Sequence, residues 1–246
     1  MSSRPSRVQT LVVLIVAGLL AVGAAPTIAD RVGGPGLGPD DVADAPLGQP
    51  PAVDDADGYA YVATREDGSP LRYDPCAPLH VVINPDGEID DGTRMIEESV
   101  SSVALATGLQ ILIDPDTDAR PGESAEASGE RRPPPVLVAW ADAKESKELK
   151  GDIAGIGGSA ESYDGDWYDT GEIVLDAPDL AAIAREEGYE VARGVVMHEL
   201  GHVVGLDHVD VKGELMQPEG ERGIVDWGPG DRAGLASLGG GACRDY

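Results

Sequence analysis

Apolar and polar positions alternate in blocks along the middle of the chain, and each block predicts one element of regular structure. Residues 79–84 form a short β-branched run that ends at a Pro-Asp-Gly turn, which predicts a strand. Apolar residues then recur at helical spacing over residues 91–107, and Gly108 is a suitable stop for that helix. Residues 109–113 predict a second strand. The first part of the domain is therefore expected to be a strand, a helix and a strand.

The second part of the chain continues in the same manner after an interruption. Residues 114–135 are rich in Pro, Gly and charge, which predicts a surface insertion. The later blocks predict strands at 136–140, 153–159 and 172–176, a helical turn at 180–184, and helices at 190–204 and 231–238. Together these elements predict an α+β domain in which helices pack on a mixed, twisted sheet.

The N-terminal part of the chain has a different pattern. Arg4 and Arg7 precede an apolar run over residues 11–25, and small residues at 27–29 suit a signal peptidase. Residues 1–29 therefore predict a secretory signal peptide, with an uncleaved membrane anchor as the alternative. Residues 30–58 are rich in Pro, Gly, Ala and Asp, so we expect a disordered linker or a short pro-segment there.

Composition narrows the picture of the remaining domain, residues 59–246. The chain has no Phe and only 4% aromatic residues, so Val, Ile, Leu and Ala must fill the core. The formal net charge of −27 would repel nucleic acid and anionic membrane surfaces, which argues against both as partners. Nothing in the sequence indicates an oligomer, so a monomer is the default expectation.

The two cysteines, Cys76 and Cys243, lie near the two ends of the predicted domain. In an oxidising compartment this placement predicts a single disulfide that ties the C-terminal segment to the region of the first strand. The alternative is a free Cys76 thiol that blocks a metal before activation.

Residues 198–208 read His-Glu-Leu-Gly-His-Val-Val-Gly-Leu-Asp-His and carry the strongest chemical signal. His198 and His202 are four residues apart, so a helix presents both rings on one face, where they can bind one zinc ion. Glu199 can hold a water and accept its proton. Gly205 can end the helix in a left-handed conformation, which lets His208 supply a third ligand.

Three protein ligands leave one coordination position for water, and this is the catalytic pattern, because structural zinc sites are closed by four ligands. The alternative, that these are ordinary surface histidines, is weak because three of the four histidines in the chain fall within this short stretch. The fourth, His80, lies on a predicted strand far from the motif and is interpreted as structural.

The extended histidine string resembles the zinc signature of the metzincin metallopeptidases. Metzincins carry a tight turn with a Met beneath the metal, and Met216 in Glu214-Leu215-Met216-Gln217-Pro218 matches it. The spacing from His208 and the Leu-Met-x-Pro form, with Pro218, are most similar to the matrixins. This resemblance implies a metzincin-like catalytic domain with an active-site helix and a C-terminal helix, and an edge strand at 153–159 that pairs with substrate.

The sequence departs from the matrixin pattern in several places. It has no Pro-Arg-Cys-Gly switch, and only His80 remains for a second zinc, so one zinc is expected. Gly220 stands where many matrixins have a Tyr in the specificity pocket, and Pro218 stands where astacin-like members have a Tyr. Asp164, Asp166 and Asp169 make a calcium site conceivable, although an exposed acidic loop is the simpler interpretation.

We therefore expect an extracellular zinc endopeptidase that hydrolyses peptide or protein substrates, with Glu199 as general base. Two alternatives stay open at this point. One is a metzincin-fold binding module without turnover, which has no need of Glu199, and the other is a non-proteolytic zinc hydrolase, which the Met216 turn disfavours.

Overall fold

The computed structural model describes residues 42–123, 133–221 and 223–245. The predicted signal peptide or anchor, the first part of the predicted linker and the middle of the predicted insertion lie outside these residues. Within the described part of the chain, no helix is long and apolar enough to cross a membrane.

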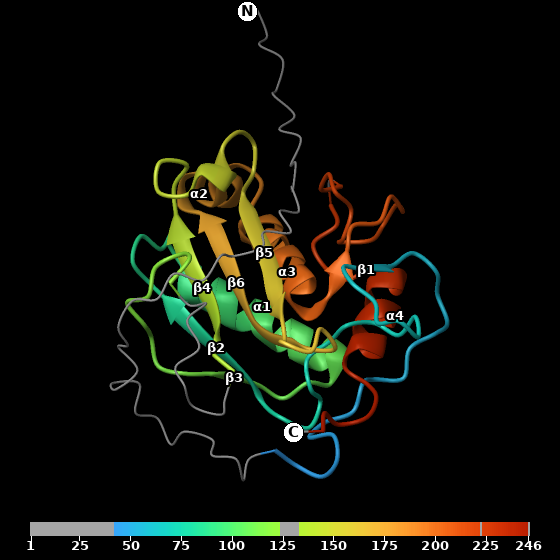
Figure 1. The fold of residues 1–246 in the computed structure, drawn as a ribbon. Helices are drawn as coiled ribbons and strands as arrows, with labels where there is room; N and C mark the ends of the chain where they lie inside the picture. Colours follow the sequence, from blue (N-terminus) through green and yellow to red (C-terminus); the bar gives the residue numbers. More distant parts are fainter. Residues whose placement is uncertain (1–41, 124–132, 222, 246) are drawn as a thin grey trace, which may run out of the picture.

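A mixed sheet of five strands, in the order β3-β2-β4-β6-β5, forms the centre of the domain (Figure 1). Its strands are β2 (Leu79–Asn84), β3 (Ile111–Ile113), β4 (Val136–Ala141), β5 (Gly155–Glu161) and β6 (Tyr168–Asp176). Strands β3, β2, β4 and β6 are parallel neighbours, whereas β5 runs antiparallel to β6 and forms one edge. The mixed sheet with its helices confirms the predicted α+β class.

Four helices and a smaller sheet complete the described fold. The helices are α1 (Gly92–Thr107), α2 (Ala177–Glu186), α3 (Tyr189–Val204) and α4 (Pro229–Leu238), with a 3₁₀ turn, η2 (Lys147–Leu149). The smaller sheet pairs β1 (Ala60–Tyr61) antiparallel with β7 (Leu206–Asp207). Figure 1 shows β1 and α4 together on the side of the molecule beyond the β5 edge.

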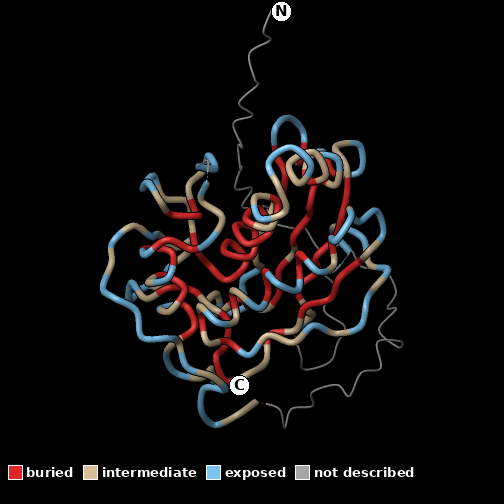
Figure 2. The backbone as a smooth tube through the Cα atoms, turned by 180° about the vertical axis from the view of Figure 1, so that it is seen from behind, coloured by how far each residue is buried: buried red, intermediate tan, exposed pale blue. Residues whose placement is uncertain are grey.

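Helices α1 and α3 pack together against one face of the large sheet and enclose the main core. Buried backbone is concentrated in the sheet and in α3, while exposed residues lie mostly in the loops and on the outer side of α1 (Figure 2). Aliphatic side chains fill most of this core, as the absence of Phe predicted, and the buried aromatic residues are Tyr73, Trp140, Tyr168 and Trp227. Helix α3 is buried on nearly all sides, as expected for a helix between a sheet and other helices.

Most predicted elements are confirmed, with differences at their ends. Strand β6 begins at Tyr168, earlier than predicted, because it pairs with β5 over nearly its whole length. The predicted helical turn at 180–184 is a full helix, α2. Its start is fixed by the Asp176 side chain, which accepts a hydrogen bond from the N–H of Asp179 at 3.0 Å. The β1–β7 pair was not predicted, since two-residue strands leave no periodic pattern.

The described part of the predicted linker, residues 42–58, follows the surface of the domain. It has no helix or strand, but the N–H of Ala43 donates to Cys76 O at 2.8 Å and the N–H of Leu47 donates to Pro75 O at 2.9 Å. These residues thus make backbone contacts with the domain, and the linker or short pro-segment over residues 30–58 stays a prediction. The domain boundary at residue 59 itself stays a prediction.

The described start of the predicted insertion is attached to the sheet. The N–H of Thr117 donates to Ile83 O at 2.9 Å, and the N–H of Gly122 donates to a carboxylate oxygen of Glu172 at 2.7 Å. Ala119 packs against a small apolar cluster on the face of the sheet opposite α1 and α3. Residues 117–122 therefore cover part of that second face.

Candidate metal centre and active site

Helix α3 presents two of the predicted ligands on one face. His198 and His202 lie four residues apart in the helix and are both only 3% exposed. Their rings meet edge to face, with centroids 4.7 Å apart. The helical spacing therefore brings the two imidazoles together, as the sequence predicted.

The helix ends at Gly205, and this ending delivers the third ligand. Gly205 has φ 117° and ψ 8°, a left-handed conformation that favours glycine, and its N–H donates to Gly201 O and His202 O. The chain then enters β7, where Leu206 and Asp207 pair with β1. This pairing directs His208 back towards the other two histidines.

The three histidines form a compact triangle of Nε2 atoms. The Nε2 atom of His198 lies 3.0 Å from that of His208 and 3.1 Å from that of His202, and the Nε2 atoms of His202 and His208 are 3.1 Å apart. Nitrogens at the usual zinc distance of about 2.0–2.1 Å in tetrahedral geometry would be about 3.3 Å apart. The triangle therefore fits a zinc ion. Within the described residues, these histidines are the one group of His, Cys, Asp or Glu placed to hold a metal.

Hydrogen bonds from the second ring nitrogens orient two of the ligands. The Nδ1 atom of His198 lies 2.8 Å from Leu215 O, and that of His202 lies 2.7 Å from Leu206 O. A carbonyl oxygen can only accept, so each Nδ1 carries the proton and donates it. Each Nε2 then keeps its lone pair for a metal, which is the usual second-shell arrangement of zinc-binding histidines.

The surroundings also keep the rings neutral. Burial lowers the pKa of His198 well below its usual range and lowers that of His202 to about 4. Burial lowers the pKa of His208 as well, and the carboxylate of Asp207 partly opposes that shift. Neutral imidazole is the form that binds zinc, so these rings are in the metal-binding state at neutral pH.

The predicted Met turn lies directly beneath the metal ligands. Met216 is 1% exposed, and a Cβ atom built on Gly201, between the two helical histidines, would lie 2.6 Å from the sulfur of Met216. Gly201 therefore lets the Met side chain pack against the helix backbone. Pro218, also predicted to support the site, follows the turn in a half-buried position.

Two acidic residues that were not predicted in this role fix the turn to α4. The carboxylate of Asp231 accepts hydrogen bonds from the N–H groups of Leu215 at 2.5 Å and Gly228 at 2.9 Å. In return, the carboxylate of Glu214 accepts from the N–H groups of Gly230 at 3.1 Å and Asp231 at 2.8 Å. Burial raises the pKa of Asp231 to about 6, while these backbone donors favour its ionised form.

A sequence signal for this arrangement exists, although it is indirect. Helix α4 begins at Gly228-Pro229, and Gly228 has no side chain with which to cap the helix. A Cβ atom at Gly228 would lie 2.2 Å from a carboxylate oxygen of Glu214. Glu214 thus takes the place of the missing capping side chain at the start of α4. The sequence signal for this is a helix start without a capping residue that follows soon after a Met turn.

Glu199 leaves α3 towards the edge strand β5. It is fully buried, and neither carboxyl oxygen has a hydrogen-bond partner among the described residues. A Cβ atom at Gly155 would lie 2.9 Å from Cγ of Glu199, and one at Gly157 would lie 2.3 Å from the Glu199 carbonyl oxygen. These glycines therefore let β5 approach the helix closely.

Burial also sets the proton affinity of this carboxyl group. It raises the pKa of Glu199 to about 8, and the nearby amide of Gly157 partly offsets the rise. A positive charge close to a buried carboxyl favours its ionised form. The group is therefore suited to gain and lose a proton near neutral pH when a cation is bound beside it.

The remaining predicted features lie away from this centre. Cys76 and Cys243 form the predicted disulfide, with Cα atoms 5.4 Å apart, so no free thiol is left to block the metal. The Nδ1 atom of His80 lies 2.9 Å from a carboxylate oxygen of Asp114, which fits its structural interpretation.

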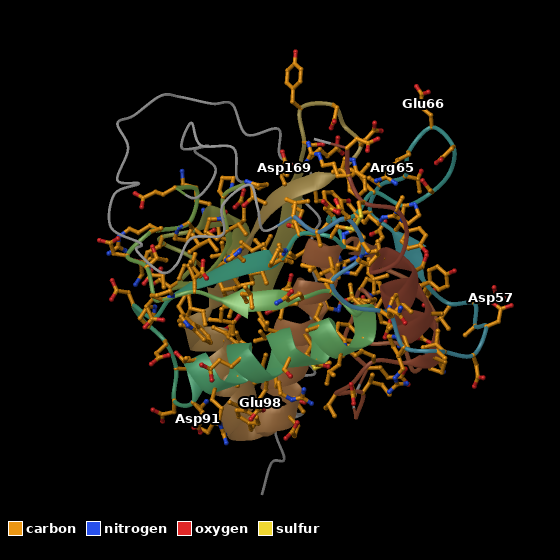
Figure 3. All side chains as sticks on the ribbon, turned by 90° about the horizontal axis from the view of Figure 1, so that it is seen from below. Asp57, Arg65, Glu66, Asp91, Glu98 and Asp169 are labelled. Carbon is orange, nitrogen blue, oxygen red and sulfur yellow. A yellow bond between two sulfur atoms is a disulfide. The ribbon has the colours of Figure 1, made fainter. Side chains whose placement is uncertain are left out.

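The acidic loop between β5 and β6 is held by arginine side chains. Arg244, next to Cys243, contacts Asp169 at 2.5 Å and Asp164 at 3.8 Å. Arg65 donates to Asp166 O at 2.7 Å and lies over the ring of Trp167. In Figure 3 the labelled Arg65 and Asp169 lie at the end of the view opposite Asp91 and Glu98, which lie by α1. These contacts agree with the simpler interpretation of an acidic loop and give no support to the alternative of a calcium site.

Three neutral histidines with oriented rings and a neighbouring carboxyl group define the class of a catalytic zinc site. Comparison with known proteins agrees, because the matrixin family model matches residues 135–238, which run from the start of β4 to the end of α4. Residues 135–238 therefore form a matrixin domain, the zinc metalloendopeptidase type in which three histidines, here His198, His202 and His208, bind the catalytic zinc. No curated protein matches the chain.

Matrixins are usually extracellular, and the disulfide is consistent with that compartment. Their activity implies protein or peptide substrates.

Proposed function

We propose that Glu199 is the general base with which this zinc endopeptidase cleaves an extended peptide aligned along β5. The observation that supports this most strongly is the contrast within the site. His198 and His202 each donate a hydrogen bond from Nδ1 to a backbone carbonyl, whereas the carboxyl group of Glu199 is buried without a hydrogen-bond partner among the described residues. Burying such a group costs free energy, and buried titratable groups of this kind cluster at functional sites.

A zinc ion held by His198, His202 and His208 would supply Lewis-acid chemistry here, because it would polarise a carbonyl and lower the pKa of a water molecule towards about 7. Glu199 takes a proton from that water as its oxygen adds to the carbonyl carbon. The same carboxyl group then gives the proton to the amide nitrogen as the C–N bond breaks, so that one water is consumed and one amine and one carboxylate are formed.

The edge strand β5 supports an extended mode of substrate binding. Within the described residues β6 is its one strand partner, so the second edge of β5 is left without a paired strand. Peptides commonly bind such an edge as an additional strand through backbone hydrogen bonds. Because β5 also packs on α3 at Glu199, a peptide paired with β5 lies beside the residues that carry the chemistry.

The N-terminal segment, residues 1–29, is proposed to direct the enzyme out of the cytoplasm, either as a cleaved signal peptide or as a membrane anchor. Its sequence pattern is the support for this proposal. N-terminal sequencing of the mature protein distinguishes the two, because a cleaved protein begins after residue 29 and an anchored one keeps the apolar run.

Glu199→Gln tests the catalytic proposal with little change in shape. We expect one zinc per chain in the variant and a fall in kcat of about 10²–10⁴-fold, the usual contribution of general acid–base catalysis. Zinc content is measured by atomic absorption, and turnover is measured with a library of quenched fluorogenic peptides. Glu190→Gln, on the same helix but exposed and paired with Arg193, is the matched control and should keep wild-type turnover.

Two results would contradict the proposal. Undiminished turnover in Glu199→Gln would remove Glu199 from the mechanism. Wild-type protein that binds one zinc but cleaves no peptide of the library would favour the binding-module alternative.

A further inference from the structure

The inner face of β5 is made of three small residues that all lie against α3. Alternate residues of a strand share a face, so Gly155, Gly157 and Ser159 point to the same side. The first two approach Glu199, where a Cβ atom would meet the helix. The third carries a hydroxyl group, and Ser159 Oγ donates a hydrogen bond to Val203 O at 2.7 Å. The strand is therefore attached to the helix at its far end by one directed bond.

The acceptor of this bond exists because α3 ends where it does. In a continuing α-helix, Val203 O would accept the N–H of Asp207. The chain instead turns at Gly205, and Asp207 belongs to β7, so the carbonyl of Val203 is one of the terminal groups that a helix cannot satisfy itself. The same turn that brings His208 to the metal thus frees a carbonyl that Ser159 binds.

The hydroxyl group of Ser159 has a second hydrogen-bond partner, Tyr73. Tyr73 Oη lies 2.7 Å from Ser159 Oγ, and since the serine proton goes to Val203 O, the tyrosine donates. Tyr73 is 4% exposed and its ring packs on that of Tyr168. The residue opposite Ser159 on β6 is Gly171, where a Cβ atom would lie 2.8 Å from Ser159 Oγ and 3.1 Å from Tyr73 Oη. The sheet therefore leaves space for the pair.

We propose that Ser159 is a positioning residue, which uses the Tyr73–Ser159–Val203 hydrogen-bond chain to fix the edge strand at a set distance from the zinc-binding helix. This inference rests on the proposed function, in which a peptide pairs with β5. A peptide held by β5 reaches the metal ligands in register only if β5 keeps its place on α3. The hydrogen-bond chain acts on the alignment of substrate, and it touches neither the metal nor the reacting bond.

If Ser159 positions β5, its loss affects long and short substrates differently, whereas a purely structural role predicts the same effect on both. A long peptide, which pairs along β5, depends on the position of the strand. A blocked dipeptide, which is too short to pair along β5, does not depend on it. Zinc binding depends only on the histidines and the turn beneath them.

Ser159→Ala removes the donor to Val203 O and is the principal test. For long fluorogenic peptides that the wild type cleaves, we expect kcat/KM to fall about tenfold, the effect of one lost, partly buried hydrogen bond. The split of that loss between KM and kcat is measured on the same peptides, and we expect KM to take most of it. Blocked dipeptide hydrolysis and zinc content should stay at wild-type values.

Thr170→Val is the matched control. Thr170 Oγ1 donates to Pro135 O, just before the neighbouring strand β4, at 2.9 Å, so the substitution removes a similar hydroxyl-to-carbonyl bond that does not reach α3. It should lower thermal stability without changing kcat/KM for long peptides. Gly171→Ala is a second test of the position of β5, because its Cβ atom would meet Gly158 O of that strand at 2.7 Å as well as both hydroxyl groups, and it should reproduce the selective loss on long peptides.

The outcomes separate this inference from the proposed function. Wild-type protein that cleaves no peptide would end the proposed function, and this inference with it. Wild-type protein that cleaves long peptides, beside a folded Ser159→Ala variant with unchanged kcat/KM, would overturn the positioning role alone. An equal loss on long and short substrates, or an equal loss in Thr170→Val, would also overturn it, since either marks general destabilisation.

Discussion

The two sides of the active site are built in opposite ways. On the histidine side, the second ring nitrogens of His198 and His202 donate to backbone carbonyls, and the turn at Met216 packs beneath them. On the other side, Glu199 has a buried carboxyl group without a hydrogen-bond partner among the described residues, against a strand without side chains at Gly155 and Gly157. The metal ligands are thus fixed by protein contacts, whereas the carboxyl group of Glu199 has no such contact, as the proposed role of a general base requires.

This contrast indicates that different parts of the fold set the orientation of the metal ligands and the environment of Glu199. Ring orientation comes from residues 206 and 215, which lie after α3. The environment of Glu199 comes from β5, on the opposite side of that helix. A change on one side should therefore leave the other side largely intact, and substitutions of graded severity can test this.

The largest effect is expected from removal of the metal or of a ligand. His202→Ala should lose tight zinc binding, and its peptide cleavage should fall to background, because two histidines do not hold the ion in the catalytic geometry. Treatment of the wild type with a chelator should have the same effect on cleavage and should lower the melting temperature, since a ligand that binds only the folded state stabilises it. Zinc content, cleavage and thermal unfolding measure these three outcomes.

His80→Ala is the control for this experiment, because His80 pairs with Asp114 outside the triangle. It should keep one zinc per chain and full activity. Loss of zinc from this variant would show that the metal centre extends beyond the three histidines.

A smaller effect is expected on the Glu199 side from Gly157→Ala. The new Cβ atom would lie 2.3 Å from the Glu199 carbonyl oxygen, so strand and helix must separate. Overpacking of this kind costs about 1–3 kcal/mol of stability. Activity should fall while zinc content stays at one per chain, which denaturant unfolding and metal analysis can establish together.

The neighbouring Gly158 provides a matched control, since a Cβ atom there meets nothing within 4 Å. Gly158→Ala should change stability by no more than about 0.5 kcal/mol. Equal stability and activity of the two alanine variants would contradict the claim that the close approach of β5 to α3 requires glycine at residue 157.

The smallest effect on activity is expected from Asp231→Asn, which acts on the histidine side through the Met turn. The N–H groups of Leu215 and Gly228 donate to Oδ2 of Asp231, and the N–H of Met216 donates to Oδ1 at 3.4 Å. The amide nitrogen of Asn cannot accept, so the donors to one of these two oxygens lose their acceptor. An unsatisfied buried donor costs about 1–3 kcal/mol. We expect a lower melting temperature, weaker zinc binding and little change in kcat when zinc is saturating.

Asp142→Asn is the comparison for that variant, because Asp142 also accepts backbone N–H groups, from Lys144 and Glu145, but on an exposed loop. Its zinc affinity should equal that of the wild type. If Asp231→Asn also bound zinc with wild-type affinity, the contacts between α4 and the Met turn would not contribute to metal binding.

The sequence predicted those parts of the site that depend on short-range spacing. His198, His202 and Gly205 belong to one helix and its end, and Met216 follows at a fixed distance, so local pattern was sufficient for all of them. The β2 and β4 strands and helix α1 were likewise predicted from their apolar periodicity.

The rest could not be predicted, because it depends on contacts between distant segments. The Ser159–Val203 bond joins residues that only the fold brings together, and so does the exchange between Glu214 and Asp231. Composition predicted a disordered linker or short pro-segment over residues 30–58, but it could not predict that Ala43 and Leu47 bond to the backbone beside Cys76. Composition reports how much apolar surface a segment can bury, but not whether its backbone finds partners on the domain.

The mutual capping of Glu214 and Asp231 has a consequence for how the domain opens. Each carboxylate accepts hydrogen bonds from backbone N–H groups of the other residue's segment. If either the Met turn or the first turn of α4 opened alone, N–H groups of the other would lose their acceptors. In native-state hydrogen exchange, the amides of Leu215 and Asp231 should therefore be released in one cooperative event with a common opening free energy. The floor of the metal centre and the last helix are, in this sense, a single foldon.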